Sequence, residues 1–230
     1  MRQIKTKAIV LTRTSYQEAD RILTLLTPDQ GKIRGLARGV RKERSKLAAG
    51  IELFSESEIS YIVGRGELMT LTSTRLIKHY DHIVSDMDRT MLGYEFLKRI
   101  NRITEEGAEA EYFELLLSSL KALDQLDFEI GLLELWFNAQ LLKLGGHQPN
   151  LTTDSTGNKL SDKSAYMLDV EDMVFSLQPE GFYNANHIKL LRLVFTTKEP
   201  SPLTKLQNID PVLSASQNLV SSMLRQHVRI

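Results

Sequence analysis

The first 80 residues alternate between short apolar runs and turns. Five runs rich in Ile, Val, Leu and Thr have the length and two-residue period of β-strands, and they cover residues 7–13, 21–27, 32–39, 52–63 and 67–77. Pro28 and Gly31 supply a turn after the second run, and Gly64-Arg65-Gly66 separates the fourth from the fifth. Five short strands in so few residues predict a small barrel, for which an OB-like fold is the natural five-stranded candidate.

After His79 the spacing of apolar residues lengthens to about three and a half, the period of an amphipathic helix. The predicted helices end near residues 104–107, 123–127 and 145–146. The prediction of each helix depends on one set of apolar residues at helical spacing: Leu92, Phe96, Ile100 and Ile103, then Phe113, Leu116, Leu120 and Leu123, then Leu133, Phe137, Leu141 and Leu144.

The last third of the chain mixes a loop, a hairpin and two further helices. Residues 152–164 are polar and predict a loop, and residues 165–177 predict a β-hairpin. Helical spacing returns at residues 186–196, and a last helix is expected with Asp210 as its cap and Pro211 at its first position.

Together the patterns predict an α+β protein in two domains. An N-terminal five-stranded OB-like β-barrel is expected in residues 1–80, and an α-helical domain in residues 81–230, with a short loop and β-hairpin insertion at residues 150–183.

Composition adds limits to this picture. The 230 residues include 29 basic and 29 acidic side chains and no cysteine, which excludes disulfides, thiolate nucleophiles and cysteine-bound zinc. There is no run of about 18 apolar residues, and the four-residue apolar patch after Lys7 is too short for the core of a signal peptide. We therefore expect a cytoplasmic protein without a membrane segment.

The neutral total hides a division of charge. Residues 1–80 contain 15 basic and 8 acidic side chains, whereas the other 150 residues contain 14 and 21. Opposite charge in the two parts favours two domains, one of which meets a polyanion. Chance variation of surface charge is the alternative.

The third predicted strand carries a basic stripe. Alternation places its basic residues on one face and its apolar residues and glycines, which would line the barrel, on the other. Residues 32–46 contain a single acidic side chain and seven basic ones: Lys32, Arg34, Arg38, Arg41, Lys42, Arg44 and Lys46. Phosphates relieve the repulsion among such charges and release counterions on binding, so the stripe indicates a polyanion-binding surface. A solvated strand and loop is the alternative.

Two further groups of residues bear on this surface. The patch would be extended by five other basic residues of the same domain: Lys5, Lys7, Arg13, Arg21 and Arg65. The aromatic residues of the domain are few, namely Tyr16, Phe54, Tyr61 and Tyr80, and most are expected in the core. Contacts to phosphates should therefore dominate over base stacking, and binding should be nearly independent of sequence.

Other motifs do not support catalysis. Gly31-Lys32-Ile33 lacks the Ser or Thr of a P-loop, Gly64-Arg65-Gly66 lacks the third glycine of a dinucleotide fingerprint, and no serine stands in a Gly-x-Ser-x-Gly elbow. We interpret His79, Asp81 and His82 as surface residues rather than metal ligands, and Trp136 as a core residue rather than a partner-binding anchor. We expect no cofactor, no metal and no enzymatic activity.

An ordered series of segments through the first 150 residues resembles a known family. The segments are Ala8-Ile9-Val10-Leu11, Glu18-Ala19-Asp20-Arg21, Leu25-Leu26-Thr27, Gly31-Lys32-Ile33-Arg34, Ala37-Arg38-Gly39, Ser45, Gly64-Arg65-Gly66-Glu67-Leu68, Leu71-Thr72, and then Phe137, Leu141, Leu142, Gly146, Pro149 and Leu151. The series is similar to the RecO family of recombination mediators, most specifically in its first 75 residues.

The resemblance implies a function and a set of partners. It implies a protein of the bacterial cytoplasm and nucleoid that binds single- and double-stranded DNA, anneals complementary strands and acts in recombinational repair. The implied partners are RecR, the acidic C-terminal tail of single-stranded DNA-binding protein (SSB) and, indirectly, RecA, which is loaded onto SSB-coated DNA.

One departure from the family concerns zinc. Many members carry four cysteines as a zinc module after a Pro-x-Leu segment, whereas this chain has Thr153 and Thr156 before Gly157 at the positions of the first pair and no second pair. We therefore expect a metal-free loop and hairpin that are held by packing alone.

The resemblance also raises the question of a site for the SSB tail. An acidic, apolar peptide needs a hydrophobic pocket beside cations. The first predicted helix offers Lys98, Arg99 and Arg102 on an apolar scaffold that includes Phe96. A solvated helix face is the alternative.

These observations lead to the hypothesis of a non-enzymatic DNA-binding mediator. Its basic patch would neutralise phosphates, so that two strands approach each other and pair. An RNA-binding OB-fold factor and a protein–protein adaptor without nucleic-acid contact are the two alternatives.

Overall fold

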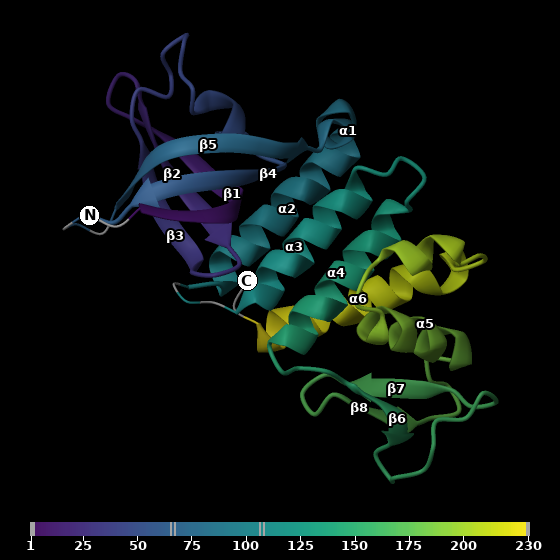
Figure 1. Ribbon diagram of the computed structural model, residues 1–230. Helices are drawn as coiled ribbons and strands as arrows, with labels where there is room; N and C mark the ends of the chain where they lie inside the picture. Colours follow the sequence, from purple (N-terminus) through teal and green to yellow (C-terminus); the bar gives the residue numbers. More distant parts are fainter. Residues whose placement is uncertain (1–2, 65, 67, 106, 108, 229–230) are drawn as a thin grey trace. The chain divides into compact units, whose positions relative to one another are not determined.

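The computed structural model describes residues 3–64, 66, 68–105, 107 and 109–228 of the chain. It consists of two compact units, Met1–Leu126 and Asp127–Ile230, which we describe separately (Figure 1). Strands give way to helices between His79 and Asp81, at the predicted domain boundary, and the first compact unit continues beyond it through three helices.

Five strands of the first unit form a closed barrel. They are β1 (Gln3–Tyr16), β2 (Asp20–Thr27), β3 (Gly31–Ala37), β4 (Ser55–Ile62) and β5 (Met69–His79), in the spatial order β1-β2-β3-β5-β4. Neighbours are antiparallel except β3 and β5, which pair in parallel over two residues of each strand. The five-stranded barrel and the α+β class predicted from the sequence are thus confirmed.

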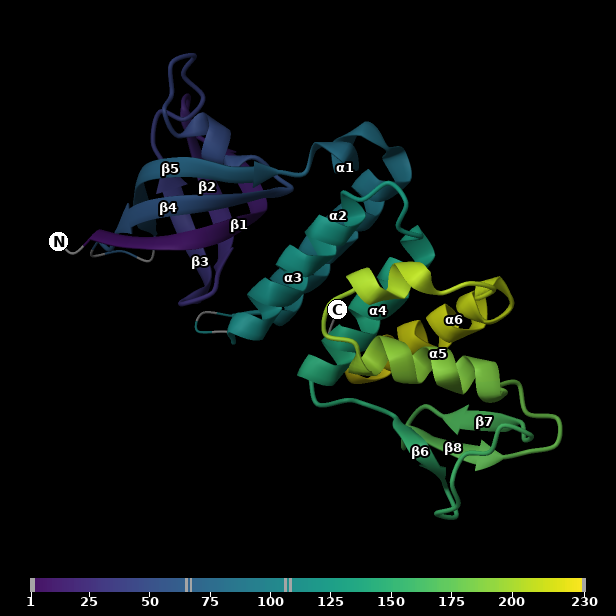
Figure 2. The same ribbon diagram turned by 45° about the vertical axis from the view of Figure 1, so that its right-hand side comes forward.

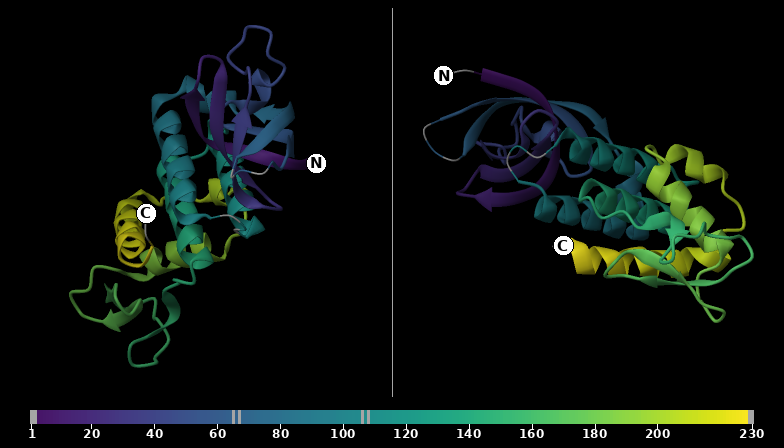
Figure 3. Two further views of the ribbon diagram at one scale, coloured as in Figure 1. Left: turned by 90° about the vertical axis from the view of Figure 1, so that its left-hand side faces the viewer. Right: turned by 90° about the horizontal axis from the view of Figure 1, so that it is seen from below.

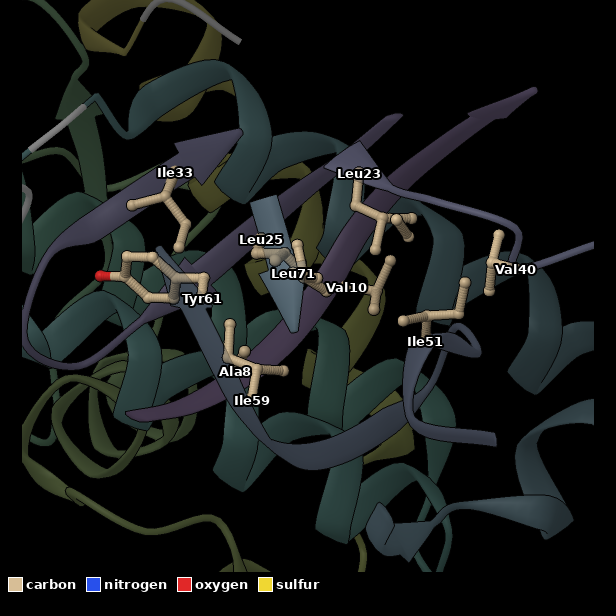
Figure 4. Close-up of a cluster of buried hydrophobic side chains, with 11 residues drawn as sticks. Ala8, Val10, Leu23, Leu25, Ile33, Val40, Ile51, Ile59, Tyr61 and Leu71 are labelled. Atoms are coloured by element: carbon tan, nitrogen blue, oxygen red, sulfur yellow. The ribbon is translucent and has the colours of Figure 1, made fainter. Parts of the chain in front are cut away.

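Alternating residues of each strand fill the barrel with aliphatic side chains and one aromatic ring. Ile33 and Ala37 of β3 belong to this core, as the alternation predicts. Figure 4 shows Ile33 and the ring of Tyr61 among Leu and Ile side chains of the barrel. Gly35 lets Leu71 pack closely against β3, because a Cβ atom at position 35 would lie 2.3 Å from Cδ1 of Leu71 and would displace that side chain. Burial raises the pKa of the Tyr61 hydroxyl.

Helices α1 (Asp81–Ser85), α2 (Met87–Ile103) and α3 (Ala110–Leu123) complete this unit, together with the short 3₁₀ turn η1 (Ala48–Ile51). Helix α2 packs on α3 and on β1, and α3 packs on β2 (Figure 2). The buried guanidinium of Arg89 donates to the backbone carbonyls of Leu123, Gln125 and Leu126 at 2.7–2.9 Å. Since these carbonyls lie at and beyond the end of α3, Arg89 ties the two long helices together.

The second unit is built on three helices, α4 (Ile130–Leu144), α5 (Ala185–Thr196) and α6 (Asp210–His227), and the 3₁₀ turn η2 (Ser201–Lys205). Each helix packs against the other two. Trp136 is fully buried in this core and donates its indole N–H to the carbonyl of Thr197 at 2.8 Å, which confirms its predicted core role. The predicted cap of α6 is wrong by one residue: Ile209 is the N-cap, and Asp210 begins the helix.

Three short strands form a small sheet beside these helices, in the order β6 (Asn150–Asp154), β8 (Val174–Leu177), β7 (Tyr166–Asp169) (Figure 3). The predicted hairpin is β7 and β8. Strand β6 overlaps the segment predicted as loop from residue 152, because its pairing with β8 depends on residues about 20 positions away.

The turn after β6 is organised by a carboxylate. Oδ1 of Asp154 accepts hydrogen bonds from the N–H groups of Thr156 and Asn158 at 2.9 Å and from the Thr156 hydroxyl at 2.7 Å. These bonds, that of the Thr156 hydroxyl foremost, hold the pKa of Asp154 below its ordinary value. Gly157 takes the left-handed conformation that the turn requires, with φ of +85°. The expectation of packing alone is corrected, since a hydrogen-bonded carboxylate also holds this turn.

Candidate nucleic-acid interface

The outer face of β1, β2 and β3 has a covered part and an exposed part. Where α2 and α3 pack on these strands the face is closed, and Leu26 is fully buried. Toward the β1–β2 turn the face is open: Arg34 is exposed, and Ile22 and Leu36 are half-buried. Ile22 pairs with Leu36, and Thr24 pairs with Arg34, so these side chains share one surface.

A basic loop, which we define as residues 38–46, continues this surface beyond β3. It lies at the same end of the barrel as the turn between β1 and β2 (Figure 1). Two hydrogen bonds join the loop to that turn, from Gly39 N–H to Oδ1 of Asp20 at 2.7 Å and from Arg41 N–H to the carbonyl of Ala19 at 2.9 Å. Gly39 has φ of +62°, a conformation that favours glycine. The loop therefore has a defined place beside β1 and β2.

Six cations of this surface are unpaired. Within the described part of the chain, no carboxylate lies at ion-pair distance from any of them, and all six side chains are exposed. We call them the open cations: Arg34, Arg38, Arg41, Lys42, Arg44 and Lys46.

Other basic residues of the barrel are neutralised by carboxylates. Lys5 and Arg75 both bind Glu58, at 2.9 and 3.2 Å, and the pKa of Glu58 is lowered by these two hydrogen bonds. Lys7 binds Glu56 at 2.8 Å, which raises the pKa of Lys7. The contrast with the open cations favours a ligand-binding role for the latter, because the open cations repel one another without a carboxylate to relieve the repulsion.

Two further basic residues predicted for the patch are placed differently, and a third is not described. Arg13 is paired with Glu52. Arg21 is half-buried and lies opposite Ala37, on the side of β2 that faces the barrel interior. Arg65 lies outside the described residues.

Lys32 is on the predicted face of β3, but its ammonium is already bound. Nζ donates to the backbone carbonyl of Asn101, near the end of α2, at 2.7 Å. A cation at the carbonyl end of a helix is stabilised there. Alternation along β3 predicts which face carries Lys32, but it does not predict that the end of α2 supplies a partner for its ammonium. Of the seven basic residues of the stripe, six are open cations and Lys32 is a structural cation.

The aromatic residues divide as the sequence predicts. Phe54, Tyr61 and Tyr80 are at most 2% exposed, whereas Tyr16 at the end of β1 is 42% exposed. Desolvation raises the pKa of the Tyr80 hydroxyl.

The residues around His82 form a small polar cluster. The ligand-type side-chain atoms of Asp81, His82 and Asp124 lie within 4.8 Å of one another, although Asp124 is more than 40 residues from His82 in the chain. The backbone N–H of His82 donates to Asp124 Oδ1 at 2.9 Å, and Lys78 Nζ lies 3.8 Å from Asp124 Oδ2. These contacts connect α1 to the end of α3, so the cluster has a structural explanation.

Comparison with known proteins places the chain in a family. The model of the family described as "Recombination protein O N terminal" matches residues 1–80, and that described as "Recombination protein O C terminal" matches residues 84–230. The chain belongs to the RecO family.

Several relatives in this family carry the name DNA repair protein RecO. One from Dehalococcoides mccartyi is 38% identical over 148 residues, which cover 64% of this chain and 58% of that relative. One from Roseiflexus is 34% identical over 154 residues, which cover 65% of this chain and 52% of the relative. One from Alkaliphilus metalliredigens is 27% identical over 234 residues, which cover 99% and 93%. The chain thus spans little more than half the length of several RecO relatives that it matches.

The proposed SSB-tail residues of this RecO-family chain lie on α2. Phe96 is fully buried in the core, so its ring offers no surface to a peptide, and this part of the prediction is corrected. Phe96 belongs to the apolar face of α2 that the helical period predicts. That face packs into the core, so Phe96 is buried together with its apolar neighbours. Lys98 and Arg99 lie 3.2 and 3.8 Å from the carboxylate of Glu95, and Arg102 is exposed.

In the described residues, no helix has both the length and the apolar character that crossing a membrane requires.

Proposed function

We propose that this chain is a DNA-binding recombination mediator that anneals complementary strands. The observation that carries the proposal is the segregation of charge on the barrel, where the open cations stand together while Lys5, Lys7, Arg13 and Arg75 are paired with carboxylates. Membership of the RecO family and the name DNA repair protein RecO of its relatives support a role in recombinational repair.

In the proposed mechanism the open cations neutralise phosphates of two strands. Each phosphate contact releases a counterion, so association is favoured by entropy and depends on salt rather than on base sequence. With less repulsion between their backbones, two complementary strands approach and pair on one protein. No step of this mechanism needs a catalytic residue, a metal or a cofactor. Binding of both single- and double-stranded DNA follows from the same contacts.

The partners of the proposed mediator are RecR, the acidic tail of SSB and, indirectly, RecA. For the tail, α2 offers an exposed apolar stripe on successive turns, formed by Met87, Met91 and Tyr94. Lys98 and Arg102 continue the same stripe toward the end of the helix. An acidic, apolar peptide is complementary to such a surface. Charge reversal of Lys98 and Arg102 should abolish binding of a tail peptide, and unchanged affinity would remove this site.

The DNA part is tested by annealing of complementary oligonucleotides over a salt series. The test variant neutralises three open cations in the basic loop, Arg41→Gln, Lys42→Gln and Arg44→Gln. A matched control removes the same charge from three cations of the barrel that lie at ion-pair distance from a carboxylate: Lys5→Gln, Arg75→Gln and Lys78→Gln.

We expect the loop variant to lose annealing and most DNA affinity at about 100 mM salt while the control retains them. Equal losses in both variants would mean that net charge alone acts and would contradict the proposal. Stronger binding of matched RNA would favour an RNA-binding factor, and absence of any oligonucleotide binding would favour an adaptor.

A further inference from the structure

Tyr16 is an exposed aromatic side chain in the barrel, and it stands at the edge of the proposed DNA surface. Its residue is 42% exposed at the end of β1, whereas the other tyrosines and phenylalanines of β1–β5 and of the turns between them are buried. Single-strand binders place bases on exposed rings, and every base has a face that can stack. The ring can therefore bind a base beside the open cations only if the ring and the cations lie on the same face of the barrel sheet.

The strand register places Tyr16 on the face of the open cations. Tyr16 pairs with Asp20, and cross-strand partners have their side chains on the same side of the sheet. The carboxylate of Asp20 points to the basic loop, since its Oδ1 accepts the N–H of Gly39 at 2.7 Å. The ring of Tyr16 thus lies on the side of the hairpin that the basic loop occupies.

The same face continues across β2 to β3. Ile22 follows Asp20 by two residues, so both side chains point outward, and Ile22 pairs with Leu36 of β3. Leu36 in turn lies two residues from Arg34 on the outward face of β3, and the exposed Arg38 follows the end of that strand. Tyr16, Ile22 and Leu36 therefore give this face an aromatic and aliphatic strip that open cations flank.

The dimensions suit one nucleotide. Arg38 follows the end of β3, next to Gly39, whose N–H is bonded to the carboxylate of Asp20, the cross-strand partner of Tyr16. Two strand spacings of about 4.8 Å separate β1 from β3, or about 10 Å. An arginine side chain spans part of this interval, so a base on the ring leaves its own phosphate within reach of Arg38. Glu18 is exposed at the tip of the turn and repels phosphates, which directs the strand toward Arg38.

We infer that Tyr16 is a stacking site for one unpaired nucleobase at the edge of the cationic surface. The inference rests on the proposed DNA binding and adds a preference to it: paired bases are stacked inside a duplex and cannot reach the ring, so the site acts on single strands alone. One captured base positions the strand, while the bases beyond it stay available for pairing.

The test compares three variants and three probes at equal salt. Tyr16→Ala removes the ring, Tyr16→Phe keeps it, and Thr14→Ala is a control two residues away on the same face. The probes are a 20-nucleotide thymidine oligomer, an abasic oligomer with the same number of phosphates, and a duplex of the same length. Because Tyr16 is exposed, the thermal midpoint of Tyr16→Ala should remain that of the parent, and this is measured first.

For the thymidine oligomer we expect Tyr16→Ala to bind about 5- to 100-fold more weakly than the parent, and Tyr16→Phe and Thr14→Ala to bind as the parent does. Affinities for the abasic oligomer and the duplex should be the same in all four proteins. The slope of log affinity against log salt should not change in Tyr16→Ala, because no phosphate contact is lost.

A second readout uses fluorescence. In Tyr16→Trp the new indole is exposed, whereas Trp136 is fully buried, so quenching by the thymidine oligomer reports on position 16. Unchanged affinity of Tyr16→Ala for the thymidine oligomer, or no quenching in Tyr16→Trp on binding, would overturn the stacking site while leaving the DNA-binding function intact. Failure of the parent protein to bind any of the three probes would instead overturn the proposed function.

Discussion

A matched pair of substitutions on β3 separates a structural cation from a binding cation. Lys32 and Arg34 are two residues apart on the same face, and both belong to the basic stripe of the sequence. In the folded chain Lys32 donates to the Asn101 carbonyl at 2.7 Å, whereas Arg34 is one of the open cations. We therefore expect Lys32→Met to lower stability and Arg34→Met to lower DNA affinity.

The two effects have different magnitudes. Six phosphate contacts give a slope of log affinity against log salt of about −4.2 for a single strand, and loss of one contact changes it to about −3.5. Between 50 and 200 mM salt that difference changes relative affinity by roughly 2.5-fold. Loss of the Lys32 hydrogen bond costs about 1–2 kcal/mol of folding free energy, since the donor is charged and the acceptor lies at a helix end.

The assay is fluorescence anisotropy of a labelled oligonucleotide over a salt series, together with urea unfolding of each variant. Lys32→Met should keep the parent slope and lose stability, and Arg34→Met should keep stability and lose about 0.7 of the slope. A slope change in Lys32→Met equal to that in Arg34→Met, without a loss of stability, would refute the assignment of Lys32 to the structure.

Three other substitutions test the fold through single contacts. Arg89→Met removes the donor to the carbonyls after α3 and should cost about 3 kcal/mol, measured by urea unfolding. Burial lowers the pKa of His187, so its neutral form is favoured in the folded state and the stability it provides should fall as pH drops below about 6.5. His187→Gln should reduce that dependence in thermal melts. The pKa of Asp154 is lowered instead, so its contribution is full above about pH 4 and is lost below. Asp154→Ala should lower the melting temperature at pH 7 and have less effect near pH 2.

Local patterns predict the strands and most of the helices because burial imposes a period on them. In β3 the alternation alone identifies Ile33, Gly35 and Ala37 as the inner face and Arg34 as an outer residue, and the structure confirms each. The pattern does not predict helix α1, since its five residues are too few to show a helical period.

Charge partners could not be predicted, because they depend on contacts between distant segments. Lys7 and Glu56 are 49 residues apart in the chain and meet through the pairing of β1 with β4. Lys32 and Asn101 are 69 residues apart and meet where α2 reaches the barrel. The local count of basic residues therefore identifies a cationic segment correctly and misses which of the cations are already neutralised.

That distinction between paired and open cations bears on how annealing would work. If every cation of the barrel were open, strands would wrap the whole surface, and a long footprint slows the release of the paired product. Pairing of Lys5, Lys7 and Arg75 removes these three cations from the open charge, while the six open cations lie in the basic loop and on the adjoining face of β3. We expect a site of this size to bind a few phosphates strongly in low salt and to exchange them readily. With the exposed ring of Tyr16 as the proposed stacking site, few bases would be withheld from pairing, so we expect the surface to favour the meeting of two strands over the retention of one.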